Sequence, residues 1–377
     1  MSGDKRLFPG KLAIQQRVLP AYRAPFFDAL AKACQGGLSV FAGQPLPQEQ
    51  IASASQLQVA QVTSAHNRHF FNPSSPFYQC WQAGLVEWLE AWGPEVLVVE
   101  ANPRYRSTPR AVRWMHSRRR PVLGWGLGAQ ALSSPLASWR QAGRRSFLLS
   151  LDGVIAYSQR GAEEYRQLGF PAEHVFVAPN AASPRPTVPP AQRATGFQGR
   201  PRLLFVGRLQ GRKRLDILLR ACAALPEALQ PDLWIVGDGP AREEFETLAQ
   251  SLYPRGEFVG ARYGAELERY FTGADLFVLP GTGGLAVQQA MAHGLPVIVA
   301  EGDGTQDDLV RTGNGWQIPP DDWQALAETL QAALTDPVRL RQMGAESYRI
   351  VAEEANLEVM VAAFVEAASA ALHQYAG

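Results

Sequence analysis

The chain has little of what several classes of protein require. Its three cysteines, Cys34, Cys80 and Cys222, are scattered among 377 residues, which argues against a disulfide framework and against a zinc site. No run reaches the roughly 18 uninterrupted apolar residues that a membrane-spanning helix needs. Residues 1–11 carry charges and no apolar run, so we expect no signal peptide there and a cytoplasmic location.

Acidic residues are absent from one long stretch of the chain, between Glu100 and Asp152. The same stretch holds ten arginines: Arg104, Arg106, Arg110, Arg113, Arg118, Arg119, Arg120, Arg140, Arg144 and Arg145. Residues 1–192 contain 20 Lys and Arg against 11 Asp and Glu, and the remainder contains 16 against 24. A solvated basic face is one interpretation, and a peripheral contact with anionic lipid headgroups at the inner face of a membrane is the other. No recognition motif accompanies the charge, so we expect no nucleic-acid partner.

Strand-like and helix-like segments alternate along the whole chain, which predicts an α/β fold with parallel sheets. In the first half the pattern predicts strands over residues 12–18, 38–42, 96–100, 121–126 and 154–158, and helices over 24–33, 77–92 and 108–118. After a stretch rich in proline and glycine it predicts strands over 202–209, 233–236, 258–260, 276–280 and 296–300. Helices are expected to begin near Arg214, Ala241, Ala265 and Leu285 and to extend over 323–335 and 338–355.

This alternation predicts two doubly wound, Rossmann-like domains that face each other across a cleft. We expect an N-terminal domain over 1–190, a linker over 191–200, a C-terminal domain over 201–355, and a last helix over 356–377 that can cross back to the first domain. In such folds, ligands bind at the carboxyl ends of the strands.

Two cations border the loop after the first strand of the second domain. Arg208 follows Gly207 at the end of the strand, and Lys213 precedes the next helix. A forked donor together with a compact point charge suits a diphosphate. An ordinary basic loop explains this motif alone equally well.

A glycine-rich loop joins the fourth strand of that domain to its helix, and its residues are Gly281, Thr282, Gly283, Gly284 and Leu285. Glycine lets backbone amides approach an anion, and a helix N-terminus adds about half a positive charge. Because the fourth strand lies beside the first where strand order reverses, both loops could hold one diphosphate. The glycine spacing also fits a dinucleotide-binding fingerprint, with Glu301 twenty positions on, so an NAD-linked oxidoreductase stays open as an alternative.

These residues resemble the retaining GT-B glycosyltransferases of family four, the glycosyl transferases group 1. The resemblance covers nearly the whole chain, and residues 205–209, 236–240, 258–260, 274–280 and 289–298, together with Lys213 and Asp216, carry it. Residues 152–158 and 178–180 resemble the end of that family's acceptor domain. The resemblance implies a hexosyltransferase that moves a sugar, with retention, from a UDP- or GDP-sugar to a glycan or lipid-linked acceptor, without a metal or other cofactor.

The resemblance also implies residue roles. Arg208 and Lys213 would stabilise the leaving diphosphate. The nucleotide sugar would contact Gly207, Gly237, Gly260, Gly281, Thr282, Gly283, Gly284, Leu285 and Gln289. On the acceptor side, we expect contacts from loop residues after two strands of the first domain: Tyr22, Arg23, Trp125 and Gly126.

The chain departs from the family pattern at two places. The family usually carries two glutamates eight residues apart, and Gly281 and Gln289 stand at these positions. Gln289 can still form hydrogen bonds, whereas Gly281 has no side chain to offer. Many members also present a histidine where this chain has Gly124 to Gly128. A catalytically silent nucleotide-sugar-binding protein and a nucleotide-sugar epimerase are therefore alternatives.

Overall fold

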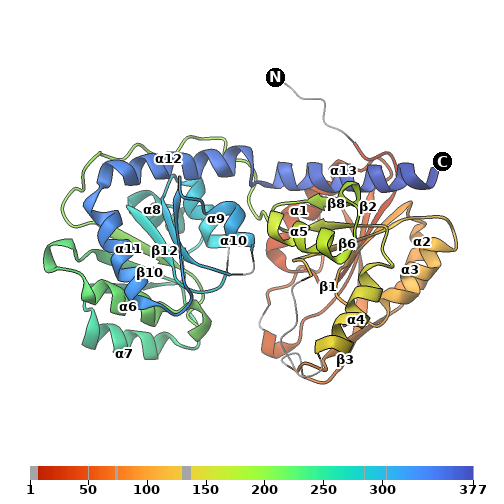
Figure 1. Ribbon diagram of the computed structural model, residues 1–377, viewed down its shortest axis with the longest axis horizontal. Helices are drawn as coiled ribbons and strands as arrows, with labels where there is room; N and C mark the ends of the chain where they lie inside the picture. The colour runs from red at the N-terminus through yellow and green to blue at the C-terminus, as the bar shows by residue number, and fades with distance from the viewer. Residues whose placement is uncertain are drawn as a thin grey trace. The chain divides into compact units, whose positions relative to one another are not determined.

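The computed structural model describes residues 7–49, 51–72, 75–129, 137–283, 285–302 and 304–376. The chain forms two compact units: unit 1 comprises Met1–Ala182 and Leu357–Gly377, and unit 2 comprises Ser183–Asn356. Each unit contains one β-sheet with helices packed on its faces (Figure 1). The predicted pair of α/β domains is therefore confirmed.

Unit 1 is built on an eight-stranded sheet with the order β4-β3-β2-β1-β5-β6-β7-β8. Its strands are β1 (Leu12–Val18), β2 (Leu38–Gly43), β3 (Gln61–Phe70), β4 (Gln79–Ala83), β5 (Val96–Glu100), β6 (Val122–Gly126), β7 (Gly153–Ala156) and β8 (Val175–Val177). Neighbouring strands are parallel except for β3 and β4. The central strands β1, β2 and β5 are buried almost throughout, as parallel strands covered by helices on both faces must be.

Two apolar cores lie on the two faces of this sheet. The helices are α1 (Ala24–Lys32), α2 (Leu85–Trp92), α3 (Thr108–His116), α4 (Ala137–Leu148), α5 (Gln159–Leu168) and α13 (Leu357–Ala376). In one core, Phe26 of α1 meets Phe364 of α13 with ring centroids 4.9 Å apart. The other core includes Leu89 of α2, Met115 of α3 and Tyr165 of α5.

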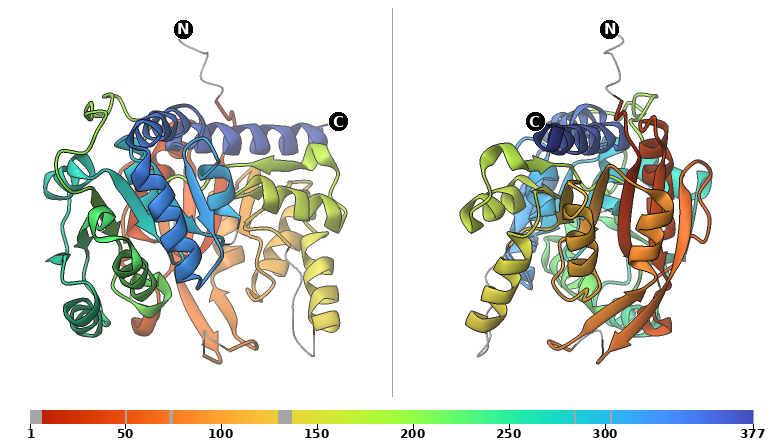
Figure 2. Two further views of the ribbon diagram at one scale, coloured as in Figure 1. Left: turned by 60° about the vertical axis from the view of Figure 1, so that its left-hand side comes forward. Right: turned by 90° about the vertical axis from the view of Figure 1, so that its right-hand side faces the viewer.

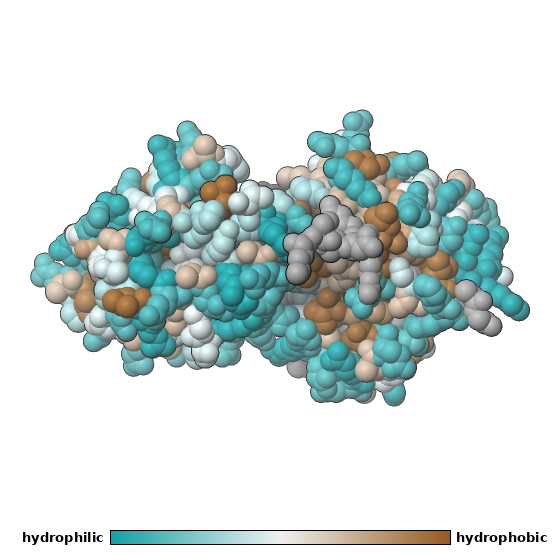
Figure 3. Space-filling model, turned by 90° about the horizontal axis from the view of Figure 1, so that it is seen from above, coloured by the Kyte–Doolittle hydropathy of each residue, from teal (hydrophilic) through white to brown (hydrophobic). Residues whose placement is uncertain are grey.

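The last helix, α13, packs in unit 1, which confirms the predicted return of the chain to its first domain. Met360, Phe364 and Ala368 of this helix are completely buried. By length and composition, the helical stretch Pro337–Tyr375 could cross a membrane, but half of its most apolar window is buried (50%). The buried part of this window belongs to the core of unit 1. On the face seen in Figure 3, hydrophobic residues of unit 1 form only small patches among hydrophilic ones.

The single helix predicted over residues 77–92 is wrong. Gln79–Ala83 form strand β4, which pairs antiparallel with β3, and α2 begins only at Leu85. Gly84 separates the two elements with φ +82°, a left-handed conformation that glycine adopts without strain. The hairpin of β3 and β4 projects beyond the neighbouring strands of unit 1 (Figure 2).

Unit 2 is built on a six-stranded parallel sheet with the order β11-β10-β9-β12-β13-β14. Its strands are β9 (Arg202–Val206), β10 (Asp232–Val236), β11 (Gly256–Gly260), β12 (Leu276–Leu279), β13 (Val297–Ala300) and β14 (Gly315–Ile318). Its α-helices are α6 (Leu215–Ala224), α7 (Arg242–Leu252), α8 (Ala265–Gly273), α9 (Leu285–Ala292), α10 (Thr305–Leu309), α11 (Trp323–Thr335) and α12 (Pro337–Glu353). The predicted pairing of the first and fourth strands, β9 and β12, is confirmed, and strand order reverses at this pair.

The proline-rich segment 183–200 lies with unit 2, so the units divide after Ala182, whereas the sequence pattern places the boundary at residue 190. Arg193 shows why. Its Nη2 donates to the carbonyl of Phe271 at 2.8 Å, and its Nη1 donates to that of His293 at 2.9 Å. These carbonyls lie at the last turns of α8 and α9, where acceptors are left without partners inside the helix. The segment is therefore fastened to unit 2 before β9 begins.

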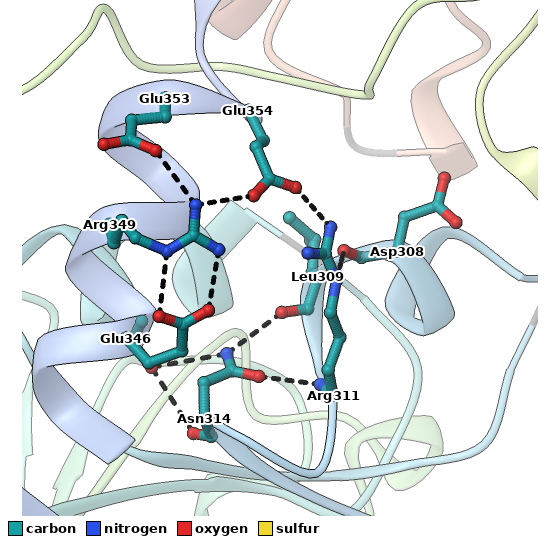
Figure 4. A network of polar contacts seen from close by, with 9 residues as sticks. Asp308, Leu309, Arg311, Asn314, Glu346, Arg349, Glu353 and Glu354 are labelled. Atoms are coloured by element: carbon teal, nitrogen blue, oxygen red, sulfur yellow. Dashed lines mark hydrogen bonds and ion pairs between the residues drawn. The ribbon is translucent and has the colours of Figure 1, made fainter. Parts of the chain in front are cut away.

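A network of ion pairs fixes the loop after α10 to the end of α12 (Figure 4). Arg311 Nη2 lies 2.6 Å from a carboxylate oxygen of Glu354, and Arg349 bridges the other oxygen of Glu354 at 2.9 Å and Glu346 at 2.7 Å. Asn314 donates to the carbonyl of Leu309 at 3.0 Å. The network holds α10 in place from the side of α12.

Candidate functional site

The carboxyl ends of β9, β10 and β11 meet through glycines. The amide of Gly207 donates to the carbonyl of Val236 at 3.0 Å, and the amide of Gly237 donates to that of Gly260 at 3.0 Å. Gly237 has φ +144°, and a Cβ at this position would lie 1.9 Å from the carbonyl oxygen of Gly207. No other residue fits there without moving the backbone. The loops after the three strands are therefore held in close contact.

The loop after β9 and the loop after β12 are joined by three hydrogen bonds. Lys213 Nζ donates to the carbonyl of Thr282 at 2.6 Å, and Arg212 Nη1 donates to the Thr282 hydroxyl at 3.1 Å. The Thr282 amide donates to the carbonyl of Arg212 at 3.1 Å. The structure thus brings Lys213, Thr282 and Gly283 together at the point where strand order reverses, which is where ligands bind in open α/β sheets.

Gly281 is required by this packing. A Cβ at this position would lie 2.4 Å from the carbonyl oxygen of Arg212 and 2.5 Å from the Cα of Lys213. Both atoms belong to the backbone, so neither can rotate away. A glutamate side chain cannot be accommodated at position 281 while the two loops keep this contact. The glycine at position 281 is therefore required by the contact between the two loops.

Burial and the neighbouring Arg212 lower the pKa of Lys213 to about 8. Desolvation is the larger cause, because the ammonium group is partly removed from water. A cation held in such a place gains from an anion that replaces the lost solvation. The site therefore favours a ligand with several negative charges, and a bound diphosphate would raise the pKa of this lysine again.

The remaining predicted residues of unit 2 surround these two loops. Arg208 is half-buried directly after β9, Leu285 begins α9, and Gln289 is exposed on the same helix. Gly284 lies outside the described residues. One residue that the sequence did not indicate also takes part: Gln306 of α10 is 3% exposed, and its amide donates to the carbonyl of Gly283 at 3.3 Å.

Unit 1 contains a cavity of about 820 Å³ at the carboxyl ends of β5, β6 and β7. Its aromatic lining consists of Phe77, Tyr78, Trp125, Phe147 and Tyr157, and its basic lining consists of Arg104, Arg106, Arg140 and Arg144. Two of the four residues predicted on the acceptor side, Trp125 and Gly126, line this cavity. Tyr22 and Arg23 are not among its lining residues.

Arg23 is 5% exposed, and its contacts lie within unit 1. Its guanidinium donates to the side-chain oxygen of Asn180 and lies 5.2 Å from the ring of Trp125. Trp125 is 2% exposed, and its ring centroid lies 5.0 Å from that of Phe364. Through these contacts Arg23 anchors the loop after β1. Tyr22 beside it is 46% exposed.

Glu100 is the acidic residue among those that line the cavity, and the sequence pattern did not single it out. It ends β5, where its carboxylate accepts the amide of Arg17 at 2.6 Å and a hydrogen bond from Tyr105. Burial raises the pKa of this carboxyl group. The signal in the sequence was a single acid at the end of an otherwise apolar strand, which is too common to be specific.

Two family models match the chain, one over each unit. Residues 190–350 match the glycosyl transferases group 1, and residues 32–181 match the glycosyl transferase 4-like domain. The chain belongs to the group 1 glycosyl transferases. Their two models meet near the boundary between the units, so the family match extends over both sheets.

Curated relatives of this chain match it over only part of their own length. A GDP-mannose-dependent alpha-mannosyltransferase of Mycobacterium tuberculosis is 35% identical over 176 residues, which are 45% of this chain and 44% of the relative. The sulfoquinovosyl transferase of Arabidopsis thaliana is 34% identical over 125 residues, which are 32% of this chain and 24% of that protein. The chain thus spans less than half the length of these two relatives.

Solved structures show that the fold is GT-B. HepE of Anabaena, solved in complex with UDP, superposes with a TM-score of 0.66 at 18% identity and covers 92% of this chain and 96% of its own. The sucrose-phosphate synthase of Thermosynechococcus elongatus gives a TM-score of 0.66 at 21% identity, with 93% and 96% covered. At such identities the likeness establishes the fold alone.

Proposed function

We propose that this protein is a glycosyltransferase that transfers a sugar from a nucleotide diphosphate-sugar, with UDP or GDP as the nucleotide. The observation that carries the proposal is the contact of Lys213 with the Thr282 carbonyl at the reversal of strand order in unit 2. Its partly desolvated ammonium, the half-buried Arg208 and the amino end of α9 are three sources of positive charge for a diphosphate.

Arg208 and Lys213 act on the leaving group. When the bond between the anomeric carbon and the phosphate oxygen breaks, negative charge develops on the nucleotide diphosphate. Preorganised cations stabilise this charge more strongly than they stabilise the intact donor, which lowers the barrier. We expect retention at the anomeric carbon and no requirement for a metal, as the family resemblance implies.

The acceptor belongs to unit 1, whose cavity lies at the carboxyl ends of β5, β6 and β7. A glycan or a lipid-linked acceptor fits this assignment. Among the relatives, a glycosyltransferase of Escherichia coli is named for colanic acid biosynthesis, which supports a glycan acceptor.

A catalytically silent nucleotide-sugar-binding protein is the second candidate. It is favoured by Gly281, because the loop pair that requires this glycine leaves no space for the usual glutamate. Binding without turnover on any acceptor extract would support the silent protein. Release of free nucleotide during transfer would support the enzyme.

Calorimetric titration with UDP, GDP and their sugars tests the donor site. We expect one nucleotide to bind with a dissociation constant in the micromolar range, as is typical for enzyme substrates of about this size. Absence of binding to all of them would overturn the proposal. Addition of EDTA should leave the affinity unchanged if no metal takes part.

We also propose a cytoplasmic protein that binds peripherally to anionic membranes through the basic surface of unit 1. The turn after α3 carries Arg118 and Arg119, and the guanidinium of Arg118 stacks on Trp114 at 3.9 Å. Vesicles with phosphatidylglycerol should bind the protein less as salt increases, and R118E with R119E should reduce binding further. Equal binding to neutral phosphatidylcholine vesicles would contradict this.

A further inference from the structure

The cavity of unit 1 is lined both by apolar aromatic surfaces and by positively charged groups, and a free sugar does not match both. Its aromatic residues offer broad apolar surfaces, as Trp125, Phe147 and Tyr157 do. Its four arginines, which line the same space, offer positive charge. A neutral oligosaccharide would use aromatic rings for stacking but would give Arg104, Arg106 and Arg140 no anion to bind. A ligand that joins an apolar body to a strong anion would use both.

The positive charge of three of the cavity arginines is not neutralised by an ion pair in the part of the chain that the structure describes. Among the residues that the structure describes, Arg104, Arg106 and Arg140 form no ion pair with a carboxylate. Arg144 donates to the carbonyl of Gly128 at 2.7 Å and so holds its guanidinium at the wall of the cavity. Arginine is the side chain best suited to phosphate, because its fork of donors matches two phosphate oxygens.

Glu100 does not cancel this charge. Its carboxylate is occupied by the amide of Arg17 and by Tyr105 at the end of β5, and burial raises its pKa. The cavity therefore keeps an excess of positive charge. An anion bound there would be partly desolvated, and its attraction to the arginines would be stronger than at an open surface.

The hairpin of β3 and β4 extends the apolar surface from this cavity outward. Phe77 lines the cavity and is nonetheless 55% exposed, and Phe71 beside it is 68% exposed, with ring centroids 6.4 Å apart. Phe71 holds its backbone at φ +64°, which costs energy for a bulky residue. Two large exposed rings at the tip of a projecting hairpin are suited to an apolar chain that is longer than the cavity.

We propose that the acceptor bound in unit 1 is a lipid phosphate. In such a molecule a single apolar chain is joined to a phosphate or diphosphate, and the molecule also carries the hydroxyl or sugar to be glycosylated. The arginines would hold the phosphate, the aromatic residues would hold the first part of the chain, and the hairpin phenylalanines would hold its continuation. This inference rests on the proposed function, since it names the acceptor of the same enzyme.

Farnesyl diphosphate is a suitable probe, because it combines a short apolar chain with a diphosphate. We expect it to bind the full-length protein at least about tenfold more tightly than inorganic diphosphate, since only the former gains apolar burial. UDP should bind at the same time without competing, because its site lies in unit 2. Titration calorimetry in the presence and absence of saturating UDP measures both points.

Paired variants localise the binding. R104Q combined with R140Q should weaken farnesyl diphosphate binding by about tenfold or more, since two charge-assisted contacts are lost. R113Q is the matched control, because Arg113 is an exposed arginine of α3 that does not line the cavity. Both proteins should keep the UDP affinity of the parent, which verifies that they are folded.

Four outcomes would overturn the inference. Inorganic diphosphate could bind as tightly as farnesyl diphosphate, or R113Q could weaken binding as much as the cavity variant does. Phosphatidylglycerol vesicles could also compete fully, which would assign the cavity to a bilayer lipid. If UDP and GDP bind while farnesyl diphosphate does not, the inference fails and the proposed function stands. If no nucleotide binds, the proposed function fails instead.

Discussion

The two units place very different structures at the carboxyl ends of their strands. In unit 2, glycines at these ends pack directly against the backbone of a neighbouring loop. Gly237 packs against Gly207, and Gly281 packs against Lys213. In unit 1 the corresponding ends carry large side chains, Glu100, Trp125 and Tyr157, around a cavity of about 820 Å³. One fold class thus produces a tight backbone cradle in one unit and a space lined by side chains in the other.

The difference teaches which ligand property each unit can recognise. Backbone amides and fixed loops suit a group of constant shape, such as a diphosphate, and they leave no freedom for substitution. Side chains around a cavity can change size and charge without moving the sheet, so this unit can vary its ligand. The glycine contacts and the cavity lining can be tested separately, because they lie in different units.

Removal of the Lys213 charge should have the largest effect. K213Q should slow sugar release from the donor by about 10²–10³-fold, as the loss of one group that stabilises developing negative charge typically does. The measurement is nucleotide release at saturating donor. R220Q is the control, because Arg220 is an exposed cation of α6, and it should leave the rate unchanged. A rate that falls equally in both variants would contradict a specific role for Lys213.

Filling the space at Gly281 should have the second-largest effect. G281A places a methyl group against the backbone of Arg212 and Lys213, and overpacking of this kind costs about 1–3 kcal/mol. We expect nucleotide affinity to fall by roughly 10- to 100-fold. G211A is the matched control, because a Cβ at Gly211 meets no atom within 4 Å. If G281A binds nucleotide as well as G211A does, the contact between the two loops is not part of the site.

The affinity for nucleotide diphosphate should depend on pH through Lys213. The pKa of Lys213 in the free protein is about 8, and a bound diphosphate raises this pKa. Below pH 8 the lysine is mostly charged before the ligand binds. Above pH 8 it is mostly neutral, so binding of the diphosphate is coupled to uptake of a proton. Affinity should therefore be constant below about pH 7 and fall by up to about tenfold per pH unit above the free pKa. K213Q should remove this fall. A parent profile that is flat up to about pH 9.5 would contradict the expected pKa.

The smallest effect is expected at the rim of the cavity in unit 1. F77A removes a ring that is 55% exposed, so the free energy of unfolding should change by no more than about 0.5 kcal/mol. Denaturant unfolding followed by circular dichroism measures this. The nucleotide affinity of unit 2 should not change. A large loss of stability would show that the hairpin tip is part of the core, and the contrast between the two units would then disappear.

Much of the fold could be predicted because its strands are buried on both faces. Strand β1 was predicted with its observed bounds, Leu12–Val18, and the helices after β11 and β12 begin at the expected residues, Ala265 and Leu285. Such apolar runs carry a strong signal because their neighbours in the sheet do not alter it. Strands β3, β8 and β14 were missed, since a single residue of the ten in β3 is buried and β8 and β14 are only three and four residues long. Their pairing depends on neighbours that the local sequence does not reveal.

The candidate site could be predicted where chemistry and topology coincide, as at Lys213 and Thr282. The sequence suggested that the first and fourth loops of unit 2 meet, and they do. It could not suggest why position 281 is glycine, because the reason is a contact with a backbone about seventy residues away in the chain. Gln306 and Glu100 were missed for the same reason: each acts through partners that only the folded chain brings near.

The return of α13 to unit 1 has a consequence for how the protein is made. A ribosome releases residues 183–356 as one unbroken stretch, so unit 2 can fold as soon as it emerges. The first 182 residues must wait for Met360 and Phe364, which complete the core beside Phe26. At about 5–20 residues per second, this delay is on the order of ten seconds or more. The N-terminal segment, although synthesised first, is therefore completed last, and until then its apolar face is a surface for chaperones.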